Sequence, residues 1–296
     1  MEQSIHIPIM AQEIISFLDP KPNTIIFDGT IGFGGHASQI LPLISKGHYY
    51  GFDQDHYAFN FCQNKFKDNI SLKIYHMSYS EGLEFLKKQK ILVDFVLLDL
   101  GISSYHIDLS ERGFTFLQDQ PLDMRMNLTN SLTAKKILNT YTIKDLSDIF
   151  YNFGELFQNK ILSQNIINYR KKHTISTTFQ LIELIKQSYR FNNNRRKFIK
   201  TCSQVFQALR IETNNELGEL NLFLEQLTTI LSTQAKIAIL SFHSIEDRIV
   251  KRFFKKNKQS FSSFTKKVIT SSKEELQLNS RAKSAKLRLY QYKANS

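Results

Sequence analysis

The fold is decided by the stretch TIIFDGTIGFGGHA, residues 24–37. It opens with a short apolar run that ends in an acid, Asp28, which is typical of a buried strand. A turn with glycine at four of seven positions follows, and the residues from Ala37 to Ser45 have a helical pattern. A strand, a glycine-rich turn and a helix in this order predict the start of a βαβ unit.

The same alternation continues on both sides of this stretch and predicts a parallel α/β sheet. Two more of its strands end in an acid, Asp53 and Asp99. The predicted strands lie at residues 24–27, 48–52, 72–75, 93–98, 235–242 and 286–292, and the predicted helices at residues 7–18, 37–45, 55–66, 80–88 and 246–256.

The pattern changes after Gly113. No proline follows Pro121, and only Gly154 and Gly218 occur beyond Gly113, so long helices are expected there. Thr142 and Asp145 resemble a capping box ahead of an apolar helical face. We therefore expect a sheet domain formed by residues 1–107 and 206–296, interrupted by an all-helical insertion at residues 108–205.

Composition excludes several classes of protein. The chain has 296 residues, 42% hydrophobic and 22% charged, which suits a globular protein. It contains no apolar stretch near the roughly 20 residues of a membrane span and no signal-peptide pattern. The two cysteines, Cys62 and Cys202, have neither metal-ligand nor disulfide spacing. We expect a cytoplasmic protein without a metal site or a membrane partner.

Positive charge is concentrated near the end of the chain. The net charge is +12, and residues 251–288 hold twelve Lys and Arg against Glu274 and Glu275 alone. This segment therefore carries +10 of the total. A polyanionic partner is one interpretation, and a solvated, poorly ordered tail is the other.

The glycine-rich turn and Asp53 indicate a ligand site. A turn without Cβ atoms lets the backbone approach a ligand closely, and it would lie at the edge where parallel sheets bind ligands. The G-x-G-x-x-G spacing of a dinucleotide site is absent, and an acid before glycines suits a small cationic ligand better. Asp53 could accept hydrogen bonds from ribose hydroxyls, although it could instead cap the next helix, for which Asp55 is the better candidate.

Three further segments carry polar groups. Residues 99–104, DLGISS, follow a strand and offer Asp99 and two serines beside small residues. Residues 112–126 combine aromatics, Asp123 and two arginines in a loop, a mixture that suits single-stranded nucleic acid. His243 and Glu246 follow the late strand and could transfer protons, or form only a structural hydrogen bond and a helix cap.

Together these motifs closely resemble the bacterial ribosomal RNA small-subunit methyltransferase H family. The resemblance runs in order from His6 to about Arg288. It is carried by H-x-P at 6–8, DGTIGFGGH at 28–36, DLGISS at 99–104, RGF at 112–114, PLDMRM at 121–126, FQALRI at 206–211 and SFHSIEDRIVK at 241–251.

The resemblance implies a class I, Rossmann-like S-adenosylmethionine-dependent methyltransferase. It would methylate the exocyclic N4 of a cytosine in 16S rRNA, within the small ribosomal subunit, by direct in-line transfer. The insertion would recognise RNA, and a homodimer is left open. The residues implied to contact S-adenosylmethionine are Gly34, Gly35, His36, Asp53, Tyr79, Asp99 and His106.

The sequence departs from the family pattern at several positions. Tyr105-His106 replaces Pro-Gln, Tyr79 replaces Phe, and FGELF at 153–157 replaces Tyr-Gly-Glu-Glu-Arg. Because the N4 lone pair of cytosine is delocalised into its ring, hydrogen-bond acceptors near N4 must help to orient it. The candidate acceptors are Asp99 and Ser103, followed by Asp123 and His243.

Two other classes remain open at this point. A nicotinamide-dependent dehydrogenase could use a similar sheet, but it would need the missing G-x-G-x-x-G spacing. An RNA-binding assembly factor without catalysis could keep the methyltransferase fold, but the complete loop from Asp28 to His36 speaks against it.

Overall fold

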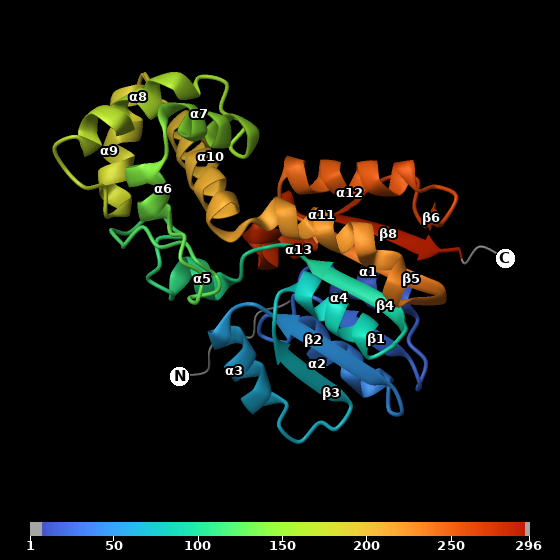
Figure 1. Cartoon of the computed structure of the whole chain (residues 1–296). Helices are drawn as coiled ribbons and strands as arrows, with labels where there is room; N and C mark the ends of the chain where they lie inside the picture. Colours follow the sequence, from blue (N-terminus) through green and yellow to red (C-terminus); the bar gives the residue numbers. More distant parts are fainter. Residues whose placement is uncertain (1–7, 294–296) are drawn as a thin grey trace. The chain divides into compact units, whose positions relative to one another are not determined.

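The computed structural model describes residues 8–293, so His6 of the recognised motif lies outside the described residues. The chain forms two compact units (Figure 1). The first unit combines residues 1–101 with 217–296, and the second unit is residues 102–216.

The first unit is built on one sheet with the strand order β3-β2-β1-β4-β5-β8-β6, in which β7 also pairs with β8. The first five of these strands are parallel, whereas β8 runs antiparallel to β5, and β6 and β7 run antiparallel to β8. The strands are β1 Ile25–Asp28, β2 His48–Asp53, β3 Leu72–His76, β4 Val93–Asp99, β5 Leu231–Ser241, β6 Phe261–Ser263, β7 Ile269–Thr270 and β8 Lys286–Tyr292.

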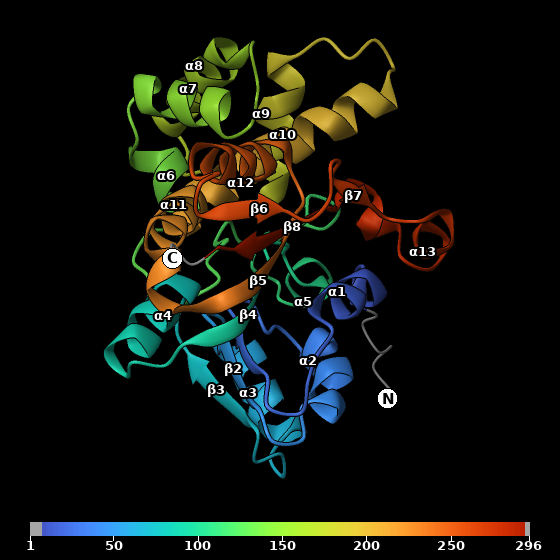
Figure 2. The same ribbon diagram turned by 90° about the vertical axis from the view of Figure 1, so that its right-hand side faces the viewer.

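Helices cover both faces of this sheet, because successive strand residues point to opposite sides. Phe27 and Tyr50 pack with residues of α4, α11 and α12, while Ile26 and Tyr49 pack with residues of α1, α2 and α3. Figure 2 shows α4 and α11 on one side of the sheet and α1 and α2 on the other. The helices are α1 Ala11–Leu18, α2 Gly35–Ile40, α3 His56–Lys65, α4 Tyr79–Lys88, α11 Glu216–Gln226, α12 Ser244–Lys256 and α13 Lys273–Leu278.

The α/β class and each predicted strand are confirmed, with small differences at the ends. The helix predicted at 37–45 is shorter: α2 ends at Ile40 and a 3-10 turn, Leu41–Leu43, follows. Pro42 explains the change, because it lacks the amide that an α-helix needs. The segment 251–288 is built into α12, the last strands and α13, so a poorly ordered tail is the wrong interpretation for it.

The second unit is helical, around an apolar core that includes Phe150, Leu162, Leu181 and Leu209. The capping box of Thr142 and Asp145 is present at the start of α7. The helices are α5 Ser104–Asp108, α6 Ala134–Thr140, α7 Ile143–Asn152, α8 Asn159–Arg170, α9 Thr178–Ser188 and α10 Arg195–Asn214.

The limits of this unit differ from the prediction. We expected 108–205, but α10 runs unbroken past Val205 and Phe206, and the unit ends at Glu216. The helix contains no glycine or proline, so nothing in the sequence stops it before Asn215, whose left-handed backbone (φ 49°) ends it. No helix among the described residues is long and apolar enough to cross a membrane.

Candidate cofactor and active site

Three carboxylates end neighbouring strands at one edge of the first unit's sheet. Asp28 is the last residue of β1, Asp53 of β2 and Asp99 of β4. In the sheet, β1 lies between β2 and β4 and pairs with both. Parallel sheets bind ligands at the carboxyl ends of their strands, beside the turn that follows the first strand. The glycine-rich turn therefore lies at the ligand-binding edge, as the sequence predicted.

The turn needs its glycines for two reasons. Gly32 and Gly34 have left-handed backbones, with φ of +53° and +71°. A Cβ at Gly34 would collide with the ring of Phe66, and one at Gly29 would collide with Leu98 and with Cβ of Tyr79. The turn is thus packed tightly against these side chains, with no room for a Cβ at Gly29 or Gly34. Gly34 is the N-cap of α2, and Gly35 and His36 begin the helix.

Asp53 holds the turn against the end of β2. Its Oδ2 accepts a hydrogen bond from the amide of Gly32 at 2.9 Å, and its Oδ1 accepts one from the amide of Asp55 at 2.8 Å. Asp55, not Asp53, caps α3, by accepting from the amides of Tyr57 and Ala58. This confirms the expectation that Asp55 is the cap and leaves Asp53 at the ligand-binding edge.

His36 is buried, and neither of its ring nitrogens has a hydrogen-bond partner among the described residues. Its Nε2 lies 3.7 Å from Oδ2 of Asp99. The amide of Asp99 donates to the hydroxyl of Thr30 at 2.6 Å, which connects the end of β4 to the turn. Buried polar atoms are rarely left without partners, so the imidazole indicates a place for a polar ligand.

The carboxylate of Asp28 is fully buried near His36 and Asp99. It accepts hydrogen bonds from the hydroxyl of Tyr49 at 2.6 Å and from the amide of Thr30 at 3.1 Å. Burial raises the pKa of Asp28 to about 6, although the Tyr49 hydroxyl and His36 act in the opposite direction. The sequence marks Asp28 only as the acid before the glycines, and it does not reveal Tyr49, because nothing in the apolar strand identifies the Tyr49 hydroxyl as a partner.

These residues fit S-adenosylmethionine, which carries a positive sulfonium, an amino group and a ribose diol. Asp28 and Asp99 provide negative charge, and Asp53 provides a carboxylate at the end of β2. The buried ring nitrogens of His36 have no hydrogen-bond partner in the part of the chain that the structure describes. The ring of Tyr79 is buried and packs edge-on against Phe223, with ring centroids 5.5 Å apart. Its contact with the cofactor stays a prediction.

Three predicted site residues belong to the second unit. Ser103 caps α5, and its hydroxyl lies 2.9 Å from Nδ1 of His106, whose buried ring packs against Phe114. Asp123 forms a two-pronged ion pair with Arg125, with both contacts at 2.7 Å. Burial opposes the shift, but the hydrogen bonds from Arg125 prevail and lower the pKa of Asp123. The structure thus brings Ser103 and His106 together and gives Asp123 a guanidinium partner.

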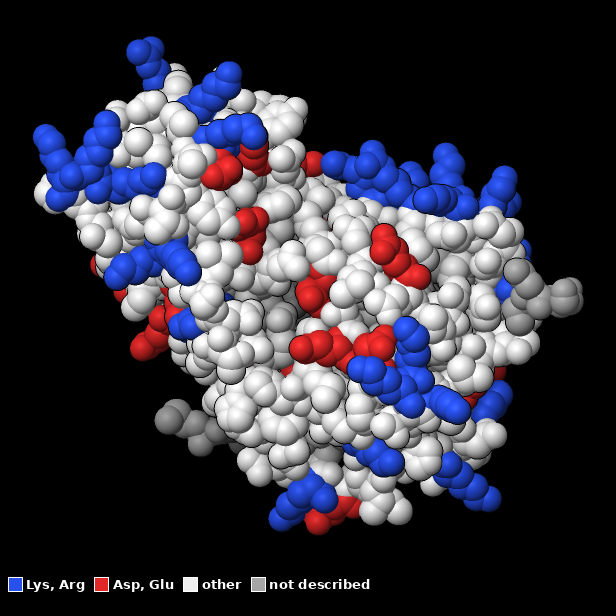
Figure 3. Space-filling view, in the orientation of Figure 1, with Lys and Arg blue, Asp and Glu red and all other residues white. Residues whose placement is uncertain are grey.

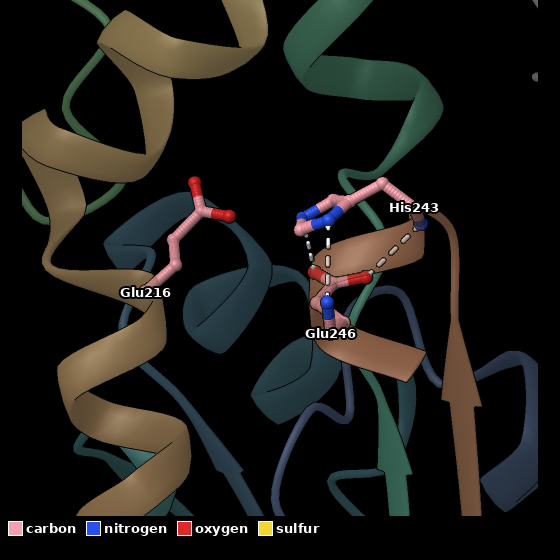
Figure 4. Close-up of side chains that lie close together, drawn as sticks. All are labelled: Glu216, His243 and Glu246. Atoms are coloured by element: carbon pink, nitrogen blue, oxygen red, sulfur yellow. Dashed lines mark hydrogen bonds and ion pairs between the residues drawn. The ribbon is translucent and has the colours of Figure 1, made fainter. Parts of the chain in front are cut away.

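His243 is the N-cap of α12. Its Nδ1 accepts from the amide of Glu246, and its Nε2 lies 3.0 Å from Oε1 of Glu246 (Figure 4). The carboxylate of Glu246 also accepts from the amides of Phe242 and His243, which completes a capping box. The structure therefore contains the helix cap that we gave as the alternative to proton transfer for His243 and Glu246. Glu216, drawn in the same figure, pairs with Arg210 within the second unit.

Comparison with known proteins identifies relatives along nearly the whole chain. The model of the MraW methylase family matches residues 3–293. A ribosomal RNA small subunit methyltransferase H of Dictyoglomus thermophilum is 39% identical, covering 99% of both chains. Proteins of the same name from Hydrogenobaculum sp. (strain Y04AAS1) and Mycoplasmopsis agalactiae are each 38% identical, covering 96% of this chain and 95% and 97% of theirs. The chain therefore belongs to the MraW methylase family.

Proposed function

We propose that this protein transfers the methyl group of S-adenosylmethionine to the exocyclic N4 of a cytosine in small-subunit ribosomal RNA. The observation that carries the proposal is the edge where the glycine turn, the buried His36 and the carboxylates of Asp28 and Asp99 meet. The relatives, which are named for methylation of small-subunit rRNA, support the RNA substrate. The choice of N4 rests on the motif resemblance.

The chain's own residues would hold the cofactor without a metal or a covalent intermediate. Asp53 would accept from its ribose hydroxyls, and the backbone of Gly34 and Gly35 would approach it where no Cβ intervenes. Asp28 and Asp99 would balance its positive charge, and His36 would offer a ring nitrogen. The sulfonium supplies a methyl group that is already activated for attack.

The remaining task of the protein is to orient the cytosine amino group. Its lone pair is delocalised, so a hydrogen-bond acceptor must align N4 with the methyl group and stabilise its increasing positive charge. Asp99 is the best supported acceptor, because it ends β4 beside the turn and its carboxylate is 24% exposed. Asp123 and His243 rank lower, since each is already bonded to a neighbour.

Neither cysteine is suited to the covalent route that methylation at cytosine C5 requires. Both thiols are buried. Burial raises the pKa of Cys62 to about 12 and that of Cys202 to about 11, so almost no thiolate is present near neutral pH. Cys62 also contacts the carbonyl oxygen of Gly32 at 3.1 Å, beneath the turn. These thiols favour transfer to nitrogen over transfer to C5.

The test is methyl transfer with labelled S-adenosylmethionine to cytidine, naked rRNA and unmethylated small subunits, assayed separately. We expect label in N4-methylcytidine, strongest on rRNA or subunits. Free cytidine should be a poor substrate, because binding energy from the rest of the RNA helps to position N4. Label on C5, on protein or on DNA alone would contradict the proposal. A homodimer and a cytoplasmic location stay predictions.

A further inference from the structure

A second basic surface lies in the helical unit, on residues that do not belong to the basic segment 251–288. It comprises Arg190, Arg195, Arg196, Lys197 and Lys200, which we call the α10 basic cap. All five side chains are exposed, and the sequence contains no Asp or Glu between Glu183 and Glu212. The cap surrounds the turn between α9 and α10, which Figure 2 shows in gold at the margin of the second unit.

The charges of Arg195 and Arg196 do not stabilise the helix that they begin. The N-terminus of an α-helix carries partial positive charge and prefers acidic residues in its first turn. The first turn of α10 contains no acid, and instead begins Arg195-Arg196-Lys197. The arginines therefore repel both one another and the helix terminus, so their charge does not stabilise α10.

The turn that presents the cap is held in place. The side chain of Asn194 caps α10 by accepting from the amide of Lys197 at 2.9 Å, and the ammonium of Lys197 donates to the carbonyl of Arg190 at 3.1 Å. Phe191 packs edge-on against Phe198. By contrast, the side chains of Arg190, Arg195, Arg196 and Lys200 form no ion pair or hydrogen bond with the described residues.

We propose that the α10 basic cap binds the phosphate backbone of the RNA substrate; this inference rests on the proposed function. Guanidinium groups match phosphate oxygens in two-pronged geometry and remain charged at any working pH. A preorganised turn lowers the entropy lost on binding. Phosphate contacts position an RNA without reading its bases, so the cap supplies affinity and orientation rather than the choice of cytosine.

The test compares two variants with equal loss of charge. One is the triple variant Arg195→Gln, Arg196→Gln, Lys200→Gln, which leaves Lys197 and the turn intact. The control is Lys46→Gln, Lys67→Gln, Lys90→Gln, which removes three exposed lysines from the first unit. Binding to small-subunit rRNA is measured across salt concentrations, alongside S-adenosylmethionine affinity and thermal unfolding.

We expect the cap variant to bind rRNA about tenfold to a hundredfold more weakly, with a log–log salt slope shallower by about 2, because each lost phosphate contact removes about 0.7. Its unfolding temperature should be unchanged or higher, since the helix loses a repulsion, and its cofactor affinity should equal that of the wild type. The control should bind RNA within about twofold of the wild type, because charge removed elsewhere breaks no phosphate contact.

The inference is overturned if the folded cap variant binds rRNA with full affinity and an unaltered slope, or if the control loses as much. A wild type that binds no RNA overturns it as well. The proposed function can fail separately. If the wild type binds rRNA through the cap but transfers no methyl group to cytosine, the inference about the cap holds and the proposed N4 methylation is wrong.

Discussion

Asp53 and Asp55, two residues apart, have different tasks at the end of β2. Asp53 contacts the glycine turn, whereas Asp55 caps α3. We expect Asp53→Ala to lower S-adenosylmethionine affinity by about 1.5–3 kcal/mol, because the carboxylate that we propose for the ribose hydroxyls is lost. Asp55→Ala should instead lower stability by about 0.5–2 kcal/mol with little change in affinity. Calorimetry and thermal unfolding separate the two, and equal affinity of wild type and folded Asp53→Ala would refute the assignment.

Asp28 should make the stability of the free protein depend on pH. Its pKa in the fold is about 6, above that of an ordinary Asp, so the native state binds a proton more readily than the unfolded chain. The unfolding free energy therefore falls as pH rises from about 4 to about 6, by at most about 3 kcal/mol from this group.

Asp28→Asn removes this penalty. We expect the variant to match the wild type near pH 4 and to exceed its stability by up to about 3 kcal/mol at pH 7. Chemical denaturation at the two pH values measures the difference. An equal difference in unfolding free energy between variant and wild type at pH 4 and at pH 7 would mean that Asp28 is ionised at both pH values. Cofactor binding should be weaker in the variant, because the buried negative charge is gone.

The cysteines should be dispensable for catalysis. Both are buried with raised pKa, and the proposed attack by N4 needs no thiolate. We expect the double variant Cys62→Ser, Cys202→Ser to keep most of its methyl transfer once it is folded. Loss of transfer in a folded variant that still binds S-adenosylmethionine would point to a different reaction.

At the scale of elements, the basic segment 251–288 divides into two classes of residue. Arg288 and Lys286 pair with Asp247 and so serve the fold. Lys251, Arg252 and Lys255 are exposed on α12, where Lys255 lies one turn after both Lys251 and Arg252. Figure 3 shows a row of basic side chains over this helix. The row, rather than the whole segment, is the candidate for phosphate binding.

Replacing Lys251, Arg252 and Lys255 with Gln should weaken binding to all RNAs alike and make the salt slope shallower by about 2. Replacing Lys266, Lys267 and Lys283 removes equal charge from the same segment outside α12 and should have less effect. Filter binding across salt concentrations measures both. Equal losses would show that net charge matters and the row does not.

At the scale of the whole molecule, the sequence predicted the sheet well, because strand residues buried on both faces form short apolar runs between glycine, proline and acidic residues. The helix cap at Asp55 and the capping box of Thr142 and Asp145 could be predicted from helix-capping preferences. The end of the insertion could not be predicted, because α10 continues through a sequence without a helix breaker. The contacts of Tyr49 with Asp28 and of Tyr79 with Phe223 join residues distant in sequence, so a local pattern does not contain them.

Each unit presents its own basic surface, the α12 row in the first and the α10 basic cap in the second. We expect an RNA long enough to contact both surfaces to bind more tightly than an RNA that contacts one of them. A short RNA that reaches only one of them should lose turnover as well as affinity, because remote binding energy positions N4.

The most direct test of the central claim is mass spectrometry of nucleosides from small-subunit rRNA of cells with the protein, without it, and with its Asp99→Ala variant. We predict N4-methylcytidine in the first sample, its loss in the second, and a strong reduction in the third, with C5-methylated cytidine unchanged throughout. Unchanged N4-methylcytidine in cells without the protein, or loss of a C5-methylated cytidine instead, would contradict the account.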